Sequence, residues 1–206
     1  VLSPVYHEVI EIFRLIRSIK PNTPICLGGA YVTTIMEDVF DDTPADFAVY
    51  GEGEITFSHL LSYLKGKLPI EQINGIMYKK GEKIITNPPQ EQIRDLDSIP
   101  YPAYELFKMN RYPVHRIVTS RGCPYKCVFC NSSSIWLGKW RKREPEKVVE
   151  EIEYLINNYK KKTFIFNDNS FNVDLKRVES FCNKILQRKL KFLWSTPVRV
   201  EIITSE

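Results

Sequence analysis

The apolar run VHRIVT (residues 114–119) leads directly into SRGCPYKCVFC (residues 120–130), where Cys123, Cys127 and Cys130 stand within eight positions. The run is typical of a buried strand, and the cysteines follow it on a loop. Cysteine thiolates are ligands for zinc and for iron–sulfur clusters. Three thiolates on one short loop would leave one iron of a cluster open to an outside group, as catalytic zinc sites leave one position open. The spacing therefore predicts an open metal centre at the end of a strand.

The sequence after the cysteines alternates between helix and strand patterns. A helix is expected from Pro145, a strand over Thr163–Phe166, a helix from Asp174 to about Lys189 and a strand over Phe192–Ser195. Together with the strand at residues 114–119, this order is strand, helix, strand, helix, strand. Such alternation indicates an α/β fold with a parallel sheet and crossover helices.

The first part of the chain shows the same alternation and then changes to a hairpin pattern. We expect strands at residues 25–27, 45–50, 73–78 and 83–86, and helices up to Lys20, at 33–40 and around 57–64. Prolines at positions 88, 89, 100 and 102 resist regular structure. The expected division is therefore a first domain over residues 1–87, a proline-rich linker over 88–112 and a second domain over 113–206.

Composition excludes several classes of protein. The chain has 206 residues, 43% of them hydrophobic and 26% charged, as in an ordinary globular protein. A formal charge of +4 is too small to imply a polyanionic partner, so nucleic acid is not an expected ligand. No stretch reaches the roughly 20 apolar residues of a membrane span, and no secretory signal is present. A cytoplasmic location is expected, where clustered thiols favour metal ligation over disulfides.

The motif RGCPYKCVFC (residues 121–130) resembles the CxxxCxxC signature of the radical S-adenosylmethionine (radical SAM) enzymes, including the aromatic residue before the last cysteine. The resemblance implies that Cys123, Cys127 and Cys130 bind a [4Fe–4S] cluster, with S-adenosylmethionine on the fourth iron. One electron would then cleave S-adenosylmethionine to methionine and a 5′-deoxyadenosyl radical. It also implies an external electron donor of flavodoxin or ferredoxin type, and a partial (β/α)6 barrel of which residues 113–206 would form the first half.

Further cofactor contacts are implied by the same resemblance. The stretch FIFNDNSF (residues 164–171) is similar to the second-strand motif whose polar end faces the amino group of S-adenosylmethionine, which implies Asp168 and Asn169 as contacts. Arg199 matches an arginine that points toward the site after the third strand, and Phe129 is expected near the adenine. The alternatives are structural: a turn or helix cap for Asp168 and Asn169, and a surface charge for Arg199. The basic run at residues 139–143 is expected to be a solvated face.

The first part of the chain resembles a second known domain. The stretches ICLGGAY (residues 25–31) and DFAVYGEGE (residues 46–54) look like the C-terminal half of the Rossmann-like (flavodoxin-like) cobalamin-binding domain that precedes many radical SAM cores. The resemblance implies Gly28 and Gly29 as cobalamin contacts. The DxHxxG motif that supplies an axial histidine in many such domains does not occur in this sequence. We therefore expect a fragment truncated at both ends, with little activity by itself.

The leading expectation is a cobalamin-dependent radical SAM enzyme that performs methyl transfer, cyclisation or related radical chemistry on a small-molecule or peptide substrate. One alternative is a radical SAM methylthiotransferase, a family with three further cysteines in its N-terminal domain, whereas only Cys26 precedes the cluster motif here. Another is a non-enzymatic iron–sulfur or zinc-binding module, with a distant fourth ligand such as His115. Cys26 and Cys182 lie at apolar positions and are expected in the core.

Overall fold

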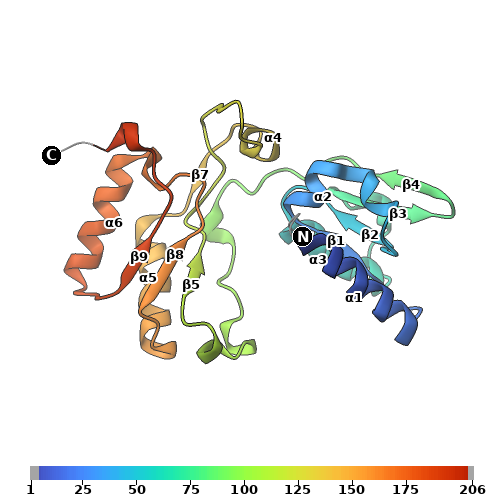
Figure 1. The fold of residues 1–206 in the computed structure, drawn as a ribbon, viewed down its shortest axis with the longest axis horizontal. Coiled ribbons are helices and arrows are strands. Elements are labelled where there is room, and N and C mark those ends of the chain that lie inside the picture. The colour runs from blue at the N-terminus through green and yellow to red at the C-terminus, as the bar shows by residue number, and fades with distance from the viewer. Residues whose placement is uncertain (1–4, 204–206) are drawn as a thin grey trace. The chain divides into compact units, whose positions relative to one another are not determined.

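The computed structural model describes residues 5–203, except for the side chains of residues 133 and 134. The chain forms two compact units, Val1–Ile93 and Arg94–Glu206, drawn from blue to green and from green to red in Figure 1. The division falls inside the stretch expected to be a linker. No helix within residues 5–203 is long and apolar enough to cross a membrane.

The first unit is built around a sheet with the strand order β1-β2-β3-β4. Strands β1 and β2 are parallel, while β2–β3 and β3–β4 are antiparallel pairs. The elements in chain order are α1 (Tyr6–Ile19), β1 (Cys26–Gly28), α2 (Ala30–Ile35), β2 (Phe47–Val49), α3 (Gly53–Leu64), β3 (Ile76–Lys80) and β4 (Lys83–Thr86). The parallel pair and its helices form the Rossmann-like part of the expected fold.

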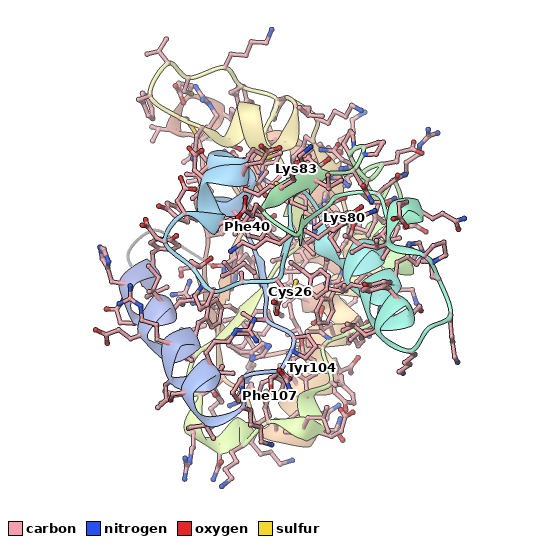
Figure 2. The ribbon with its side chains drawn as sticks, turned by 90° about the vertical axis from the view of Figure 1, so that its right-hand side faces the viewer. Cys26, Phe40, Lys80, Lys83, Tyr104 and Phe107 are labelled. Carbon is pink, nitrogen blue, oxygen red and sulfur yellow. The ribbon has the colours of Figure 1, made fainter. Side chains whose placement is uncertain are left out.

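Local sequence explains the hairpin at the edge of this sheet. Lys80 pairs with Lys83 across a two-residue turn, and both are labelled in Figure 2. Gly81 in the turn has φ +66°, a conformation that glycine adopts without the steric cost of a side chain.

The helix expected at residues 33–40 is instead α2 followed by a 3-10 helix, because Met36 has a left-handed φ of 53°.

The second unit contains a parallel sheet with the order β5-β8-β9. Helices α5 and α6 connect these strands and pack against each other. The elements are β5 (His115–Ile117), β6 (Ser120–Arg121), α4 (Ser132–Trp136), β7 (Arg141–Lys142), α5 (Pro145–Tyr159), β8 (Thr163–Phe166), α6 (Leu175–Gln187) and β9 (Leu193–Ser195). The sequence patterns predicted every element here except β6, β7 and α4.

Short 3-10 helices complete the description of the fold. They are η2 (Met36–Phe40), η3 (Ile70–Gln72), η4 (Leu96–Ser98), η5 (Tyr104–Leu106), η6 (Met109–Arg111), η7 (Phe171–Val173) and η8 (Val200–Ile202). The core of the second unit lies between the sheet and its two long helices and is rich in phenylalanine, with Phe164, Phe166, Phe171 and Phe181 all buried. This core supports the strand ends from which the site is built.

Residues 94–112 are packed onto the second unit. Tyr104 and Met109 are buried in its core, and the Lys161 ammonium donates hydrogen bonds to the carbonyls of Met109 and Tyr112. Buried hydrogen bonds of this kind hold a proline-rich segment in place without regular structure. The proline-rich stretch is therefore ordered against one unit from Arg94 onward.

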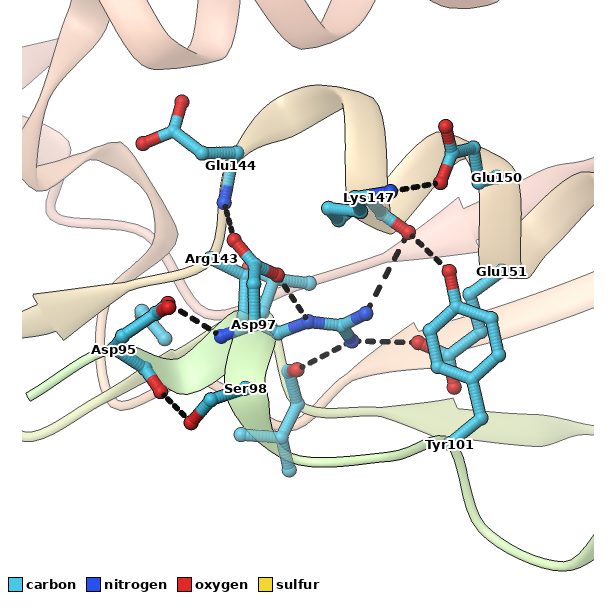
Figure 3. A network of polar contacts seen from close by, with 12 residues as sticks. Asp95, Asp97, Ser98, Tyr101, Arg143, Glu144, Lys147, Glu150 and Glu151 are labelled. Atoms are coloured by element: carbon cyan, nitrogen blue, oxygen red, sulfur yellow. Dashed lines mark hydrogen bonds and ion pairs between the residues drawn. The ribbon is translucent and has the colours of Figure 1, made fainter. Parts of the chain in front are cut away.

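Arg143 joins the same segment to the second unit, as Figure 3 shows. Its guanidinium donates to Glu151 at 2.5 Å and to Asp97 at 3.3 Å, and it lies over the ring of Tyr101. Asp97 also accepts the backbone N–H of Glu144 at 2.7 Å. The expectation that the basic run is a solvated face is wrong for Arg143, whose side chain is largely buried among these carboxylates.

Candidate functional site

The three cysteines lie on residues 122–139, which we call the cysteine loop. The loop leaves the sheet after β6 and returns through β7, and these two short strands pair in an antiparallel way. Gly122 begins the loop with φ +84°, and a Cβ atom there would lie 1.9 Å from the carbonyl oxygen of Lys139 at the other end. The two ends of the loop therefore touch backbone to backbone, and only glycine fits at the point of contact.

The cysteine loop presents its thiols near hydrogen-bond donors. Cys123, Cys127 and Cys130 are all free, and Cys130 is exposed. The sulfur of Cys127 accepts a hydrogen bond from Arg199 at 3.5 Å, and that of Cys130 accepts one from the backbone N–H of Ser132 at 3.5 Å. The thiolate is the form of cysteine that binds metals. Within the described residues, no three histidine, cysteine or acidic side chains are arranged to hold a single metal ion.

Residues from other strand ends reach the cysteine loop. Arg199, which follows β9, stacks on the ring of Tyr125 at 4.0 Å besides its contact with Cys127. Its backbone is held by Asn172, which accepts the N–H of Arg199 at 2.8 Å and donates to its carbonyl at 2.9 Å. Asn169, which follows β8, donates to the hydroxyl of Ser132 at 2.5 Å. The structure therefore brings two of the predicted contact residues to the loop.

Asp168 has a different environment from its neighbour. Its side chain is only 4% exposed and accepts hydrogen bonds from the backbone N–H and hydroxyl of Thr119, at 2.7 and 2.5 Å. It accepts two more from the N–H and hydroxyl of Ser120, at 3.1 and 2.7 Å. Because both carboxylate oxygens are used in this way, Asp168 links the end of β8 to β6. The polar group that faces the cysteine loop at this strand end is Asn169.

Phe129 and Trp194 lie in contrasting places. Phe129 is 90% exposed at the tip of the cysteine loop, so its ring is available to a ligand. Trp194 packs on Phe166, Phe171 and Phe181 and belongs to an aromatic cluster of the second unit.

Sequence reasoning did not identify Ser132, Tyr125 or Asn172 as site residues. Ser132 and Tyr125 stand close to the cysteines in the sequence, but nothing local marks Asn172.

His115 is not placed to complete a metal site with the cysteines. It lies at the first residue of β5, whereas the cysteine loop follows the other end of that strand. Its ring packs on Tyr104 at 5.1 Å and on Phe164 at 6.3 Å. Burial lowers the pKa of His115, so the imidazole is neutral at pH 7. The histidine is therefore a packed residue at the opposite end of the sheet.

A glycine-rich edge forms at the carboxyl ends of β1 and β2 in the first unit. Gly29, with φ 106°, directly precedes α2, and its carbonyl accepts hydrogen bonds from the N–H and hydroxyl of Thr33, each at 3.0 Å. The same hydroxyl accepts the N–H of Gly51 at 3.0 Å. Thr33 thus ties the turns after both strands together. Gly28 is the last residue of β1 and lies at the same edge, where open α/β sheets bind ligands.

Of the two cysteines outside the loop, Cys26 is expected to react slowly with alkylating reagents. Burial raises the pKa of the Cys26 thiol, labelled in Figure 2, to about 12. At pH 8, well below that pKa, very little of Cys26 is thiolate, the form that reacts. We expect iodoacetamide to label the exposed Cys130 at least about 100-fold faster than Cys26, measured by peptide mass spectrometry. Cys26 should become as reactive as Cys130 only in denaturant; comparable rates in the folded chain would contradict its buried placement.

The sequence is similar to a known protein family and to several known enzymes. Residues 117–202 match the family described as the radical SAM superfamily. The chain is 34% identical to an uncharacterized methyltransferase, PH0819, of Pyrococcus horikoshii, across 94% of this chain and 44% of that protein. It is 29% identical to the anaerobic magnesium-protoporphyrin IX monomethyl ester cyclase of Rubrivivax gelatinosus, across 97% of this chain and 38% of that enzyme. The chain thus spans less than half the length of these two relatives.

A solved structure shares the arrangement of the elements. The fold is similar to that of OxsB, a cobalamin-dependent S-adenosylmethionine radical enzyme solved with aqua-cobalamin and S-adenosylmethionine bound, with a TM-score of 0.76 at 24% identity. The similarity covers 92% of this chain and 28% of that chain. The expected α/β fold, part of a Rossmann-like domain followed by part of a radical SAM barrel, is therefore confirmed. Residues 117–202 thus match the radical SAM superfamily, and the chain shares the fold of a radical SAM enzyme over most of its length.

Proposed function

We propose that this protein is a cobalamin-dependent radical SAM enzyme that performs methyl transfer, cyclisation or related radical chemistry. The observation that carries the proposal is the cysteine loop, with three free thiols at the end of a parallel sheet and polar residues from two other strand ends beside it. The names of the relatives, a methyltransferase and a cyclase, support these two classes of reaction. The substrate would be a small molecule or a peptide.

The cysteine loop fits an iron–sulfur cluster by the chemistry of its donors. Cys123, Cys127 and Cys130 would each ligate one iron, leaving a fourth iron for S-adenosylmethionine. The guanidinium of Arg199 and the N–H of Ser132 already lie at hydrogen-bond distance from two of the sulfurs, and contacts of this type tune iron–sulfur clusters. When bound, the cluster supplies the electron that cleaves S-adenosylmethionine. The protein's own part is to bind, orient and exclude water.

The remaining site residues have distinct proposed roles. Asn169 and Arg199 would contact the polar groups of S-adenosylmethionine, because both lie beside the cysteine loop. Phe129 would lie against the adenine, with its exposed ring as the contact surface. Asp168, predicted as a cofactor contact, would act on S-adenosylmethionine only through its neighbour Asn169, since its carboxylate is used inside the fold.

Cobalamin is proposed to bind at the glycine-rich edge of the first unit. Gly29 and Gly51 both have positive φ and are exposed, so a ligand can approach their backbone closely. Gly28 and Gly29 would contact the cofactor there. The corresponding domain division is a cobalamin-binding part over residues 1–87, a linker over 88–112 and a radical SAM part over 113–206. An external flavodoxin or ferredoxin in the cytoplasm would supply the electron.

Anaerobic reconstitution of the chain with iron and sulfide tests the proposal. We expect about four irons and four sulfides per chain with broad visible absorption. The variants Cys123→Ala, Cys127→Ala and Cys130→Ala should each lose most of the iron, whereas Cys182→Ala, a matched cysteine outside the loop, should retain it. Addition of S-adenosylmethionine should change the electron paramagnetic resonance spectrum of the reduced cluster. Stoichiometric zinc without colour would overturn the proposal and favour a zinc-binding module.

A further inference from the structure

A network of buried polar groups lies directly under the cysteine loop. Its members come from three separate segments: Thr119 and Ser120 before the loop, Asp168 after β8, and Arg177 on α6. All four side chains belong to residues that are at most 5% exposed. A buried carboxylate and a buried guanidinium each carry a large desolvation penalty unless hydrogen bonds and an opposite charge compensate it. Packing alone therefore does not explain why charged groups are buried here.

Arg177 holds the strand that leads to the cysteines. Its Nη2 donates to the carbonyl of Thr119 at 2.9 Å and to its hydroxyl at 2.7 Å. The Thr119 hydroxyl in turn donates to Asp168, as described above, so the guanidinium and the carboxylate meet through one threonine. The backbone of Thr119, four residues before Cys123, is thus fixed from both sides.

The same guanidinium also holds the strand by which the loop returns. The Nε of Arg177 donates to the carbonyl of Arg143 at 3.3 Å, while the N–H of Arg143 donates to the carbonyl of Thr119 at 2.9 Å. Both ends of the cysteine loop are therefore attached to one side chain on α6. The guanidinium carbon also lies over the Phe171 ring, 5.3 Å from its centroid.

The network is not arranged for stability alone. The Nη1 of Arg177 is buried and has no hydrogen-bond partner within the described residues. An unsatisfied buried donor is costly, and a well-packed apolar set of the same volume is often at least as stable as a buried ion pair. Such groups persist where they specify one local conformation. Here that conformation is the pair β6 and β7, from which the cysteine loop projects.

We propose that Arg177 and Asp168 are positioning residues that hold the two ends of the cysteine loop in the register needed for its three thiols to share one cluster. The inference rests on the proposed function of the three cysteines. It assigns Arg177, which no local sequence pattern marks, to the support of the metal centre. It also gives Asp168 a role that its four hydrogen bonds explain without direct contact with a cofactor.

The test compares iron retention in Arg177→Gln and Asp168→Asn with that in Arg188→Gln, all in the reconstituted chain. Arg188 follows the same helix α6, but its ion pairs are with Glu146 and Glu153 on α5, so it serves as the matched control. Circular dichroism would first establish a temperature at which every variant is folded. The readout is the rate at which a chelator such as bathophenanthroline removes iron from the assembled cluster.

We expect Arg177→Gln and Asp168→Asn to lose iron about 10- to 100-fold faster than the unchanged chain, the range seen when groups supporting metal ligands are removed. Arg188→Gln should stay within about twofold, since its partners Glu146 and Glu153 lie on α5 and not in the cysteine loop. The reduced clusters of the first two variants should also show shifted or broadened paramagnetic resonance signals. A structural role alone would lower the melting temperature and leave the release rate and the spectrum of the folded protein unchanged.

If Arg177→Gln does not fold, Arg177→Lys and Thr119→Val carry the same test, because they retain the charge or the side-chain volume and remove only some of the donors. Folded variants that hold and release iron as the unchanged chain does would overturn the positioning role and leave the proposed function intact. Failure of the unchanged chain to assemble any iron–sulfur cluster would instead overturn both. The two failures are therefore distinguishable in one set of measurements.

Discussion

Gly122→Ala is expected to abolish cluster assembly by the cysteine loop. A Cβ atom at this position would lie 1.9 Å from the carbonyl oxygen of Lys139 and 3.0 Å from its carbonyl carbon. Neither atom belongs to a flexible side chain, so the clash is relieved only if β6 and β7 move apart. Alanine at φ +84° also adds about 1–2 kcal/mol of backbone strain. The measurement is iron per folded chain after reconstitution, which should fall to near the level of the cysteine variants.

Gly138→Ala provides the matched control in the same loop. Gly138 has a similar left-handed conformation, φ +65°, but nothing lies within 4 Å of the position its Cβ would take. The substitution should therefore cost only the strain, about 1–2 kcal/mol, and leave most of the iron-binding capacity. Equal loss of iron in both variants would show that left-handed strain, rather than the contact with Lys139, controls the loop.

The hydrophobic pattern of the sequence predicted the helices and strands that bury a regular apolar face. The strand predicted at Thr163–Phe166 is β8 with the same bounds, and the helices predicted from Pro145 and from Asp174 are α5 and α6. Strands β6 and β7 have two residues each, too few for any periodicity to be visible. They exist because distant segments pair, and such pairing is set by tertiary contacts rather than by local preference.

Some residues of the candidate site could likewise be predicted from local sequence, and others could not. The three cysteines are close in the sequence, so their spacing predicted a shared ligand. Arg199 lies 72 positions from Cys127, and only a family resemblance, not any local pattern, suggested that they meet. Asp168 and Asn169 are neighbours with opposite surroundings, since one points into the fold and the other toward Ser132. Which of two adjacent polar residues faces a ligand depends on the partners each finds, and those come from other parts of the chain.

Arg143→Met is expected to destabilise the second unit by about 3–5 kcal/mol, the range for removing one partner of a buried ion pair. The side chains of Arg143 and Glu151 are 12% and 3% exposed, and their closest nitrogen and oxygen lie 2.5 Å apart. Methionine fills much of the same space but leaves the Glu151 carboxylate buried, with the Tyr104 hydroxyl as a remaining donor. Chemical denaturation of the unchanged chain and the variant would measure the change in the free energy of unfolding.

The double variant Arg143→Met with Glu151→Gln separates the cost of an unpaired charge from the loss of packing. Glutamine removes the buried negative charge and can still accept a hydrogen bond from Tyr104, so the double variant should be more stable than Arg143→Met alone. Lys147→Met, which removes an exposed ion pair with Glu150 on the same helix, should leave the free energy of unfolding nearly unchanged. If the double variant is no more stable than Arg143→Met, the loss comes from contacts of the arginine with Asp97 and the backbone of Val118, because these are absent from both variants. Recovery of stability would instead identify charge compensation of Glu151 as the reason an arginine stands at this position.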